Sequence, residues 1–210
     1  MIYAYLEEHF SRRKNPCIIE VGAHIGTDTV ELSRFVNEGK LICFEPDPRN
    51  ALSLQKLQKK VQFELVEKAV GKEDGEVTFY QSYGKKSGVA REITDLSSTK
   101  KPMKVKDKHP WVKFAKIIVQ SVTLDNYCEL NDLSAIDLIW ADIQGGELDL
   151  VLGAQKVLQN TKLFYFECVM NSVKLYAGKP TYEQILNALP SESKWSLEFS
   201  SSTDVLLKRL

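Results

Sequence analysis

The sequence lacks any run of about 18 apolar residues, so it contains no obvious membrane-spanning helix. Its first fifteen residues carry five charged side chains among the apolar ones, which is unlike the apolar core of a signal peptide. We therefore expect a cytoplasmic protein that does not associate with membranes.

Cysteine is scarce and scattered. The four cysteines, Cys17, Cys43, Cys128 and Cys168, form no CxxC pair, which argues against a structural zinc site. Three of them lie in apolar runs that are typical of buried strands. Because free cysteine behaves as a small apolar residue, we expect reduced thiols in the core.

An excess of charge is also missing. The chain has 28 basic and 28 acidic residues, so its overall charge gives no indication of nucleic-acid binding. Residues 84–118 differ from the rest, with ten basic against three acidic residues and a local charge of +7. This basic insertion is either a lid that attracts a phosphorylated sugar, a nucleotide sugar or a nucleic-acid backbone, or simply a solvated loop.

The 210 residues are 43% hydrophobic and 27% charged, which is typical of one globular domain. We predict a single domain over 1–210, in which apolar strand-like runs alternate with segments of helical periodicity. Such alternation predicts an α/β fold with a parallel sheet. Two further strands, 76–81 and 116–121, bracket the basic stretch. The other expected strands are 17–21, 41–44, 61–66, 136–141 and 163–169, the helices are 3–10, 28–36, 48–60, 124–130, 147–158 and 182–189, and a final hairpin pairs 195–199 with 205–207.

Two motifs in the first half point to a nucleoside ligand. Glu20 to Gly26 reads acidic-x-Gly-x-x-x-Gly between a strand and a helix, where glycine lets the backbone approach a ligand closely. The spacing differs from the GxGxxG that dinucleotides require, so a ligand without phosphates fits better. Glu45 follows 19 residues after Gly26 at the end of the next strand, where a carboxylate accepts hydrogen bonds from ribose hydroxyls. The alternative is that the glycines serve only a tight turn.

Several motifs follow one another along the chain: Ile19 to Gly26, Phe44 to Pro48, Ala69 to Gly71, Asp74 to Val77, Val122 to Asp125 and Asp142 to Glu147. Their order resembles the FkbM family of class I methyltransferases. That resemblance implies a Rossmann-like, doubly wound, mostly parallel seven-stranded sheet with an antiparallel C-terminal strand and helices on both faces. It also implies S-adenosylmethionine as cofactor and methylation of an oxygen on a sugar or other small acceptor.

The expected cofactor contacts come from the ends of three strands and from the glycine loop. We also expect either Ala69 or Glu67 to border the adenine, whereas Tyr165, Phe166 and Tyr176 fit either an acceptor pocket or the core. Ser97, Ser98 and Thr99 are given no role. The predicted cofactor residues are Glu20, Gly22, Ala23, Gly26, Thr27, Glu45, Pro46, Ala69 and Asp142.

Three side chains are candidates for catalysis. Asp142 ends a central strand and is the first candidate for the base that takes the acceptor's proton, although it could instead cap the following helix. His24 could shuttle a proton because its ordinary pKa is near 6.5, and Glu147 is the third candidate. A divalent cation held by Asp142, Glu147 and Glu167 is an alternative that we do not expect.

The Asp142 to Glu147 motif departs from the family pattern, which usually reads Lys-x-Asp-x-Glu-Gly-x-Glu. Here the lysine is missing and Gln144 replaces the first glutamate, whereas Asp142 and Glu147 remain. Either an ion pair has been lost without effect or the acceptor chemistry differs. A nucleoside-binding protein without catalysis, a nucleic-acid methyltransferase and an NAD-dependent oxidoreductase are the alternative functions, and the oligomeric state is left open.

Overall fold

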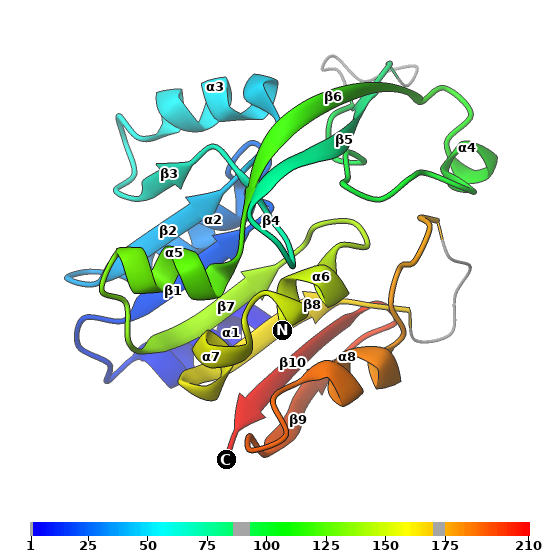
Figure 1. Cartoon of the computed structure of the whole chain (residues 1–210). Coiled ribbons are helices and arrows are strands. Elements are labelled where there is room, and N and C mark those ends of the chain that lie inside the picture. Colours follow the sequence, from blue (N-terminus) through cyan, green and yellow to red (C-terminus); the bar gives the residue numbers. More distant parts are fainter. Residues whose placement is uncertain (1, 86–92, 170–174) are drawn as a thin grey trace.

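The computed structural model describes residues 2–85, 93–169 and 175–210. Its main element is a seven-stranded sheet in the order β3-β2-β1-β7-β8-β10-β9 (Figure 1). The first five run parallel, and β10 is antiparallel to both of its neighbours, so the expected antiparallel final strand is confirmed. The strands are β1 (Cys17–Val21), β2 (Lys40–Phe44), β3 (Glu64–Val66), β7 (Ile136–Ala141), β8 (Thr161–Glu167), β9 (Trp195–Ser200) and β10 (Asp204–Arg209).

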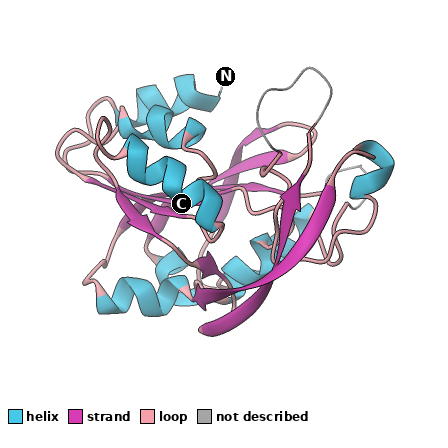
Figure 2. Ribbon diagram, turned by 90° about the horizontal axis from the view of Figure 1, so that it is seen from above, coloured by secondary structure: helices cyan, strands magenta, loops and turns pink. Residues whose placement is uncertain are grey.

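Helices cover both faces of this sheet (Figure 2), as the resemblance implies. Successive residues of a strand point to opposite faces, so Ile18 and Ile19 belong to two different apolar clusters. One face packs against α1 (Ile2–Phe10), α2 (Thr27–Ser33) and α3 (Pro48–Leu57). The other packs against α5 (Leu124–Leu130), α6 (Glu147–Leu152), α7 (Gln155–Gln159) and α8 (Tyr182–Ala188).

The middle of the chain builds a second sheet. A long antiparallel hairpin, β5 (Gly75–Tyr83) and β6 (Lys113–Val122), is joined in parallel by the short β4 (Ala69–Val70). Figure 1 shows this hairpin rising beyond the edge of the main sheet. The expected strands 76–81 and 116–121 are therefore confirmed and longer than predicted. Between them lies the short helix α4 (Val105–Lys108), which was not predicted.

The expected helix over 147–158 is wrong as one element, because the chain breaks it between α6 and α7. A Cβ on Gly153 would lie 2.1 Å from the carbonyl oxygen of Gly71, so this glycine lets the loop after β4 pass close to the helix end. Gly153 also uses its carbonyl oxygen to accept from the backbone N–H of Asp125. A contact between segments about eighty residues apart therefore ends α6 at a point where the apolar pattern of the sequence predicts that the helix continues.

Several residues of the predicted insertion, 86–92, lie outside the described part, so a domain over 1–210 with an insertion at 84–118 stays a prediction. All four cysteines are free thiols. Cys43, Cys128 and Cys168 are buried, as expected, whereas Cys17 is only partly buried. Among the described residues, no helix is both long and apolar enough to cross a membrane.

Candidate functional site

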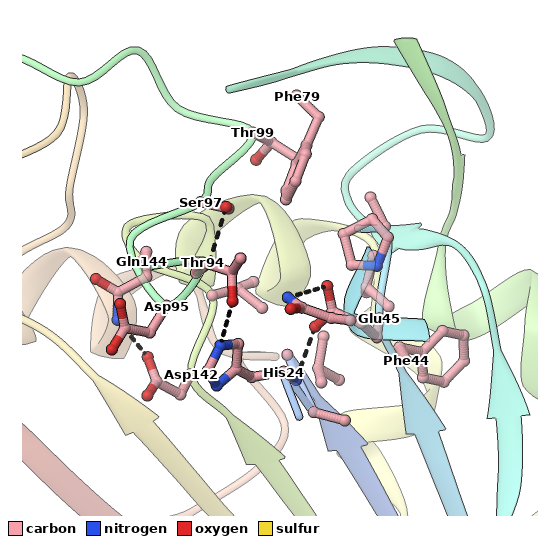
Figure 3. Close-up of a pocket in the computed structure, with 18 of the residues that line it drawn as sticks. His24, Phe44, Glu45, Phe79, Thr94, Asp95, Ser97, Thr99, Asp142 and Gln144 are labelled. Atoms are coloured by element: carbon pink, nitrogen blue, oxygen red, sulfur yellow. Dashed lines mark hydrogen bonds between the residues drawn. The ribbon is translucent and has the colours of Figure 1, made fainter. Parts of the chain in front are cut away.

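A cavity that is partly open to solvent lies where β1, β2 and β7 end. In Figure 3, Glu45 and Phe44 lie on one side of it and Asp142, Gln144 and Asp95 on the other, with His24 between them. The lining residues from the main sheet and its loops are Val21, Gly22, Ala23, His24, Thr27, Asp28, Phe44, Glu45, Pro46, Asn50, Asp142, Ile143 and Gln144; those from the second sheet and the insertion are Lys68, Ala69, Val70, Phe79, Thr94, Asp95, Ser97 and Thr99.

The glycine loop is shaped by packing within the protein. Gly22 has φ of 93°, and a Cβ there would lie 2.0 Å from the carbonyl oxygen of Asp142. Gly26 has φ of 91°, and a Cβ there would lie 2.3 Å from a side-chain carbon of Leu57. Both positions therefore require glycine because of the backbone conformation and the close packing of the protein itself, and not because a ligand lies near. This agrees with the alternative that the glycines serve a tight turn. Gly22 still lines the cavity, whereas Gly26 lies behind it.

Glu45 is held by the backbone of two neighbouring segments. One carboxylate oxygen accepts from the His24 N–H at 2.7 Å, and the other accepts from the Asp47 N–H at 2.8 Å and the Asn50 amide at 3.3 Å. Burial raises the pKa of Glu45 to about 7, although the backbone hydrogen bonds oppose the shift. A carboxylate has about four acceptor sites, so about one remains for a ligand hydroxyl in the cavity.

Glu20 lies beneath the site and does not line it. Its carboxylate accepts from the hydroxyl of Thr29 at 2.6 Å and from the thiol of Cys43 at 3.0 Å. Burial raises its pKa to about 7. In this structure the acidic residue of the glycine motif joins β1, α2 and β2, and its contact with a cofactor stays a prediction.

His24 connects the glycine loop to the insertion. Its φ of 51° is in the left-handed region, and its Nε2 lies 2.7 Å from the Thr94 hydroxyl. The side chain therefore stands between the two sides of the cavity (Figure 3). A proton-shuttle role for His24 stays a prediction.

Asp142 lines the cavity and does not cap α6. The N-cap of that helix is Gly146, without a side-chain cap, while an Asp142 oxygen accepts from the Gln144 amide at 2.8 Å. Desolvation by the surrounding protein and the charge of the nearby Glu167 raise the pKa of Asp142, although the residue is exposed at the cavity. The geometry leaves this carboxylate available to a ligand.

Glu147, in contrast, faces away from the cavity and is fully buried. One of its oxygens accepts from the backbone N–H groups of Ile143 and Gly145, so it holds the turn before α6. The other has no hydrogen-bond partner among the described residues, and burial raises the pKa to about 7. A catalytic role for Glu147 stays a prediction that this placement does not favour.

The alternative metal site also lacks support. Within the described ranges, no three histidine, cysteine or acidic side chains group closely enough to hold a metal ion. Glu167 instead pairs with the amino group of Lys179 at 2.8 Å. The charges near Asp142 are therefore balanced by a lysine from a distant segment.

Several lining residues were not predicted. Phe79 of β5 and the insertion residues Thr94, Asp95, Ser97 and Thr99 reach the cavity through a bridge between Tyr80 and Ser98. The hydroxyl run at 97–99 was visible in the sequence, but its place was not, since it depends on the pairing of β5 with the insertion.

The aromatic candidates of the last parallel strand do not line the cavity. Tyr165 stacks on Trp140 with ring centroids 3.7 Å apart, and Phe166 is fully buried in the core. Tyr176 is also fully buried, and its hydroxyl donates to the carbonyl oxygen of Leu96. Glu67 does not line the cavity either, whereas Ala69 does; a contact of Ala69 with adenine stays a prediction.

A family model described as "Methyltransferase FkbM domain" matches residues 20–195. Among curated proteins, the 2-O-methyltransferase NoeI of Sinorhizobium fredii (strain NBRC 101917 / NGR234) is 32% identical over 181 residues, which cover 85% of this chain and 73% of that protein. The range of the family model includes both the glycine loop and the Asp142-to-Glu147 region.

Three solved structures are similar in fold. An rRNA methylase from Streptococcus thermophilus has a TM-score of 0.54 at 12% identity, covering 100% of this chain and 95% of that one. The N-terminal domain of EvdMO1, solved in the presence of SAH and D-fucose, has a TM-score of 0.53 at 10% identity, covering 99% and 81%. Magnesium protoporphyrin IX methyltransferase from Synechocystis PCC 6803, with bound SAM, has a TM-score of 0.51 at 7% identity, covering 100% and 76%. At such identities the likeness is one of fold.

Proposed function

The chain belongs to the FkbM family of methyltransferases, and on that premise we propose that it transfers the methyl group of S-adenosylmethionine to a hydroxyl oxygen of a small molecule. The observation that carries the proposal is one cavity lined by Glu45 at the end of β2 and Asp142 at the end of β7, the two strands that flank β1 and its glycine loop. In doubly wound sheets, ligands bind at the carboxyl ends of the strands.

The Glu45 side suits the adenosine part of the cofactor. Phe44, Ala69, Val70 and Phe79 provide apolar surface for a base, and the acceptor site left on Glu45 suits a ribose hydroxyl. Ala23, Thr27 and Pro46 line the same cavity, in keeping with their proposed contacts. On the other side, Asp142 would approach the reacting end of the cofactor, whose sulfonium supplies an electrophilic methyl group.

The Asp142 side suits a polyhydroxylated acceptor. Thr94, Ser97, Thr99 and Gln144 present hydroxyl and amide groups, with Asp95 as a second carboxylate. Such groups exchange hydrogen bonds with sugar hydroxyls, and the relative NoeI is named a 2-O-methyltransferase. Sugars are therefore the first acceptors to test.

Two lysines near the Asp142 side already have acidic partners. Lys100 pairs with Asp149, and Lys179 pairs with Glu167, so neither binds a phosphate without releasing a carboxylate. Lys68, in contrast, lines the cavity and is exposed, so phosphorylated sugars are tested together with neutral ones.

We assign the base to Asp142. When bound, the cofactor would supply an electrophilic methyl group to the acceptor oxygen and keep the electron pair of the methyl–sulfur bond on its sulfur, and the Asp142 carboxylate would accept the hydroxyl proton. A raised pKa makes this carboxylate a better proton acceptor. The walls of the cavity would hold oxygen and methyl carbon in line, which contributes up to about 7–11 kcal/mol.

Calorimetric titration with S-adenosylmethionine, S-adenosylhomocysteine and NAD tests the cofactor. We expect both sulfur nucleosides to bind and NAD not to bind; binding of NAD alone would support an oxidoreductase instead. Transfer of a labelled methyl group is then measured on neutral sugars, sugar phosphates and RNA. Cofactor binding without transfer to any acceptor would favour a binding protein, and transfer to RNA alone would favour a nucleic-acid methyltransferase.

A further inference from the structure

A tight turn follows β7 and carries Gln144 in a left-handed conformation. Gln144 has φ of 54° and Gly145 has φ of 103°; the left-handed region is unusual for a residue such as glutamine. The Gln144 carbonyl oxygen accepts from the Ser98 hydroxyl at 2.9 Å. Interactions with a distant segment therefore hold the turn beside the cavity.

The Gln144 side chain links two carboxylates. Its amide nitrogen donates to Asp142 at 2.8 Å and lies 3.5 Å from an oxygen of Glu167, and the first of these bonds is drawn in Figure 3. An amide nitrogen has two hydrogens, so it can serve both acceptors. A second acid at this position would instead add to the repulsion.

Lys179 completes this chain of contacts. It is only 5% exposed, and its amino group lies 2.8 Å from the same Glu167 oxygen. A Cβ on Gly145 would lie 3.4 Å from the Cβ of Lys179, so the lysine also packs against the turn. Burying a lysine is costly unless a carboxylate pairs with it. Here the partner is Glu167, the carboxylate that also lies beside the Gln144 amide.

The charges around Asp142 show why this cation matters. Glu167 of β8 and Asp28 of α2 both disfavour its charged form, whereas Lys179 favours it. Glu20 of β1, Tyr165 of β8 and Tyr176 also interact electrostatically with Asp142. Of the described charged groups named here, Lys179 is the one that offsets the acidic neighbours.

We propose that Lys179 is a positioning residue of the site: its ion pair with Glu167 holds the Gln144 side chain, which in turn orients the Asp142 carboxylate toward the cavity. The proposal rests on the function assigned to Asp142 above. Lys179 touches neither acceptor nor cofactor in this scheme and acts only through Glu167 and Gln144.

The loop that carries Lys179 is anchored to the insertion. Tyr176 donates its hydroxyl to Leu96, and the backbone of Ala177 donates to Lys101. The insertion therefore braces Lys179 through Tyr176 and Gln144 through Ser98, so both ends of the chain of contacts are fixed by one segment.

The test compares Lys179→Met, Lys179→Arg and, as a matched control, Lys100→Met, which removes a lysine paired outside the cavity. The carboxyl carbon of Asp142 is followed by ¹³C NMR as pH is varied, without ligand and with S-adenosylhomocysteine. We expect its titration midpoint to rise by about one pH unit in Lys179→Met, because an opposite charge has been removed. Lys179→Arg and Lys100→Met should leave it near the wild-type value.

Activity gives a second readout on the acceptor found by the labelled-methyl screen. Lys179→Met should lower kcat with little change in the KM for S-adenosylmethionine, and Lys179→Arg should restore part of kcat. If Lys179→Met does not fold, Gln144→Met removes the same link at the cavity edge and should raise the Asp142 midpoint in the same direction.

An unchanged Asp142 midpoint in a folded Lys179→Met or Gln144→Met variant overturns the proposal. That result would leave the proposed function intact, provided that the wild type binds the cofactor and Asp142→Asn loses turnover. Failure of the wild type to bind S-adenosylhomocysteine would overturn the function instead, and the titration without ligand would still decide the role of Lys179.

Discussion

The Glu45 side of the cavity and the Asp142 side differ in how far apart along the chain their parts lie. Glu45 is held by Asp47, Asn50 and His24, the most distant being 21 residues away. Asp142 depends on Gln144, which is held by Ser98 at a separation of 46 residues and lies near Glu167 and Lys179. The hydrogen bonds to Glu45 thus come from two consecutive strand–helix units, whereas the contacts around Asp142 come from several segments far apart in the chain. We expect a mutation on the Glu45 side to affect only nearby contacts, and a mutation on the Asp142 side to affect contacts of several distant segments.

The largest expected effect is a loss of turnover without a loss of cofactor affinity, which would distinguish the Asp142 side from the Glu45 side. Asp142→Asn is expected to lower kcat by about 10²- to 10⁴-fold because general-base assistance is lost, while affinity for S-adenosylmethionine stays within about twofold. Methyl transfer and calorimetry measure the two quantities. Asp149→Asn, a matched change outside the cavity, should alter neither, and wild-type turnover in Asp142→Asn would leave that residue without a catalytic role.

On the other side, Glu45→Ala should weaken cofactor binding. Loss of a charged hydrogen-bond partner costs about 1.5–3 kcal/mol, or roughly 10- to 150-fold in Kd. Calorimetry measures the change, and circular dichroism checks that the fold survives the loss of the bonds to His24 and Asp47. Glu67→Ala is the control, since Glu67 bonds the exposed Gln55 and does not line the cavity. Equal losses in both variants would contradict the assignment of the ribose to Glu45.

Stability should depend on pH through the buried Glu147. Burial raises its pKa from 4.5 to about 7, so the folded state favours the protonated form. Protonated Glu147 thereby adds to the free energy of unfolding. This stabilisation is fully present below pH 4.5 and is lost as pH rises through 7, by at most about 3 kcal/mol. Denaturant unfolding between pH 5 and 8 should show a smaller fall for Glu147→Gln than for wild type.

An exposed acid provides the control for that experiment. The free energy of unfolding of Glu183→Gln should fall with pH as that of wild type does, because Glu183 is exposed on α8. If the stability of Glu147→Gln falls with pH as steeply as that of wild type, the pH dependence belongs to the other acids with raised pKa values, which are Glu20, Glu45 and Asp142.

The smallest effect should come from the contact that joins the two sides. Thr94→Val removes the hydroxyl beside His24 Nε2, and loss of one neutral hydrogen bond corresponds to about a 2- to 10-fold change. We expect the change in the KM for the acceptor and not in the Kd of the cofactor. Thr78→Val in β5 is the control, and a loss confined to cofactor binding would mean that His24 serves the Glu45 side alone.

Local patterns predicted most of the sheet. The strands at 17–21 and 136–141 and the helix at 124–130 have the expected bounds, because each carries its own apolar pattern between clear breaks. The expected strand at 61–66 is shorter, starting at Glu64. The two-residue β4 forms only because it pairs with β6, so no local sequence pattern predicts it.

The site divides in the same way. Gly22, Glu45 and Asp142 were found from motifs that end adjacent strands, and all three line the cavity. Glu147 belongs to the same motif as Asp142, yet it points into the protein, because five positions further along a turn and a helix reverse the direction of the side chain. The family pattern also drew attention to a lost lysine and glutamate, but it did not predict that Gln144 and Lys179 would meet there.

By itself, the sequence determined the α/β alternation, the glycine loop, the carboxylates at the strand ends and the family. Each of these rests on residues close together in the chain, whose patterns are set by local geometry and burial. Only the tertiary structure decided that Ser98, Glu167 and Lys179 gather around Gln144, that the insertion reaches the cavity at Thr94, and that Glu20 lies beneath it. Those contacts join segments far apart in sequence, and they form only when the packing of two sheets and their loops brings the side chains within hydrogen-bonding distance.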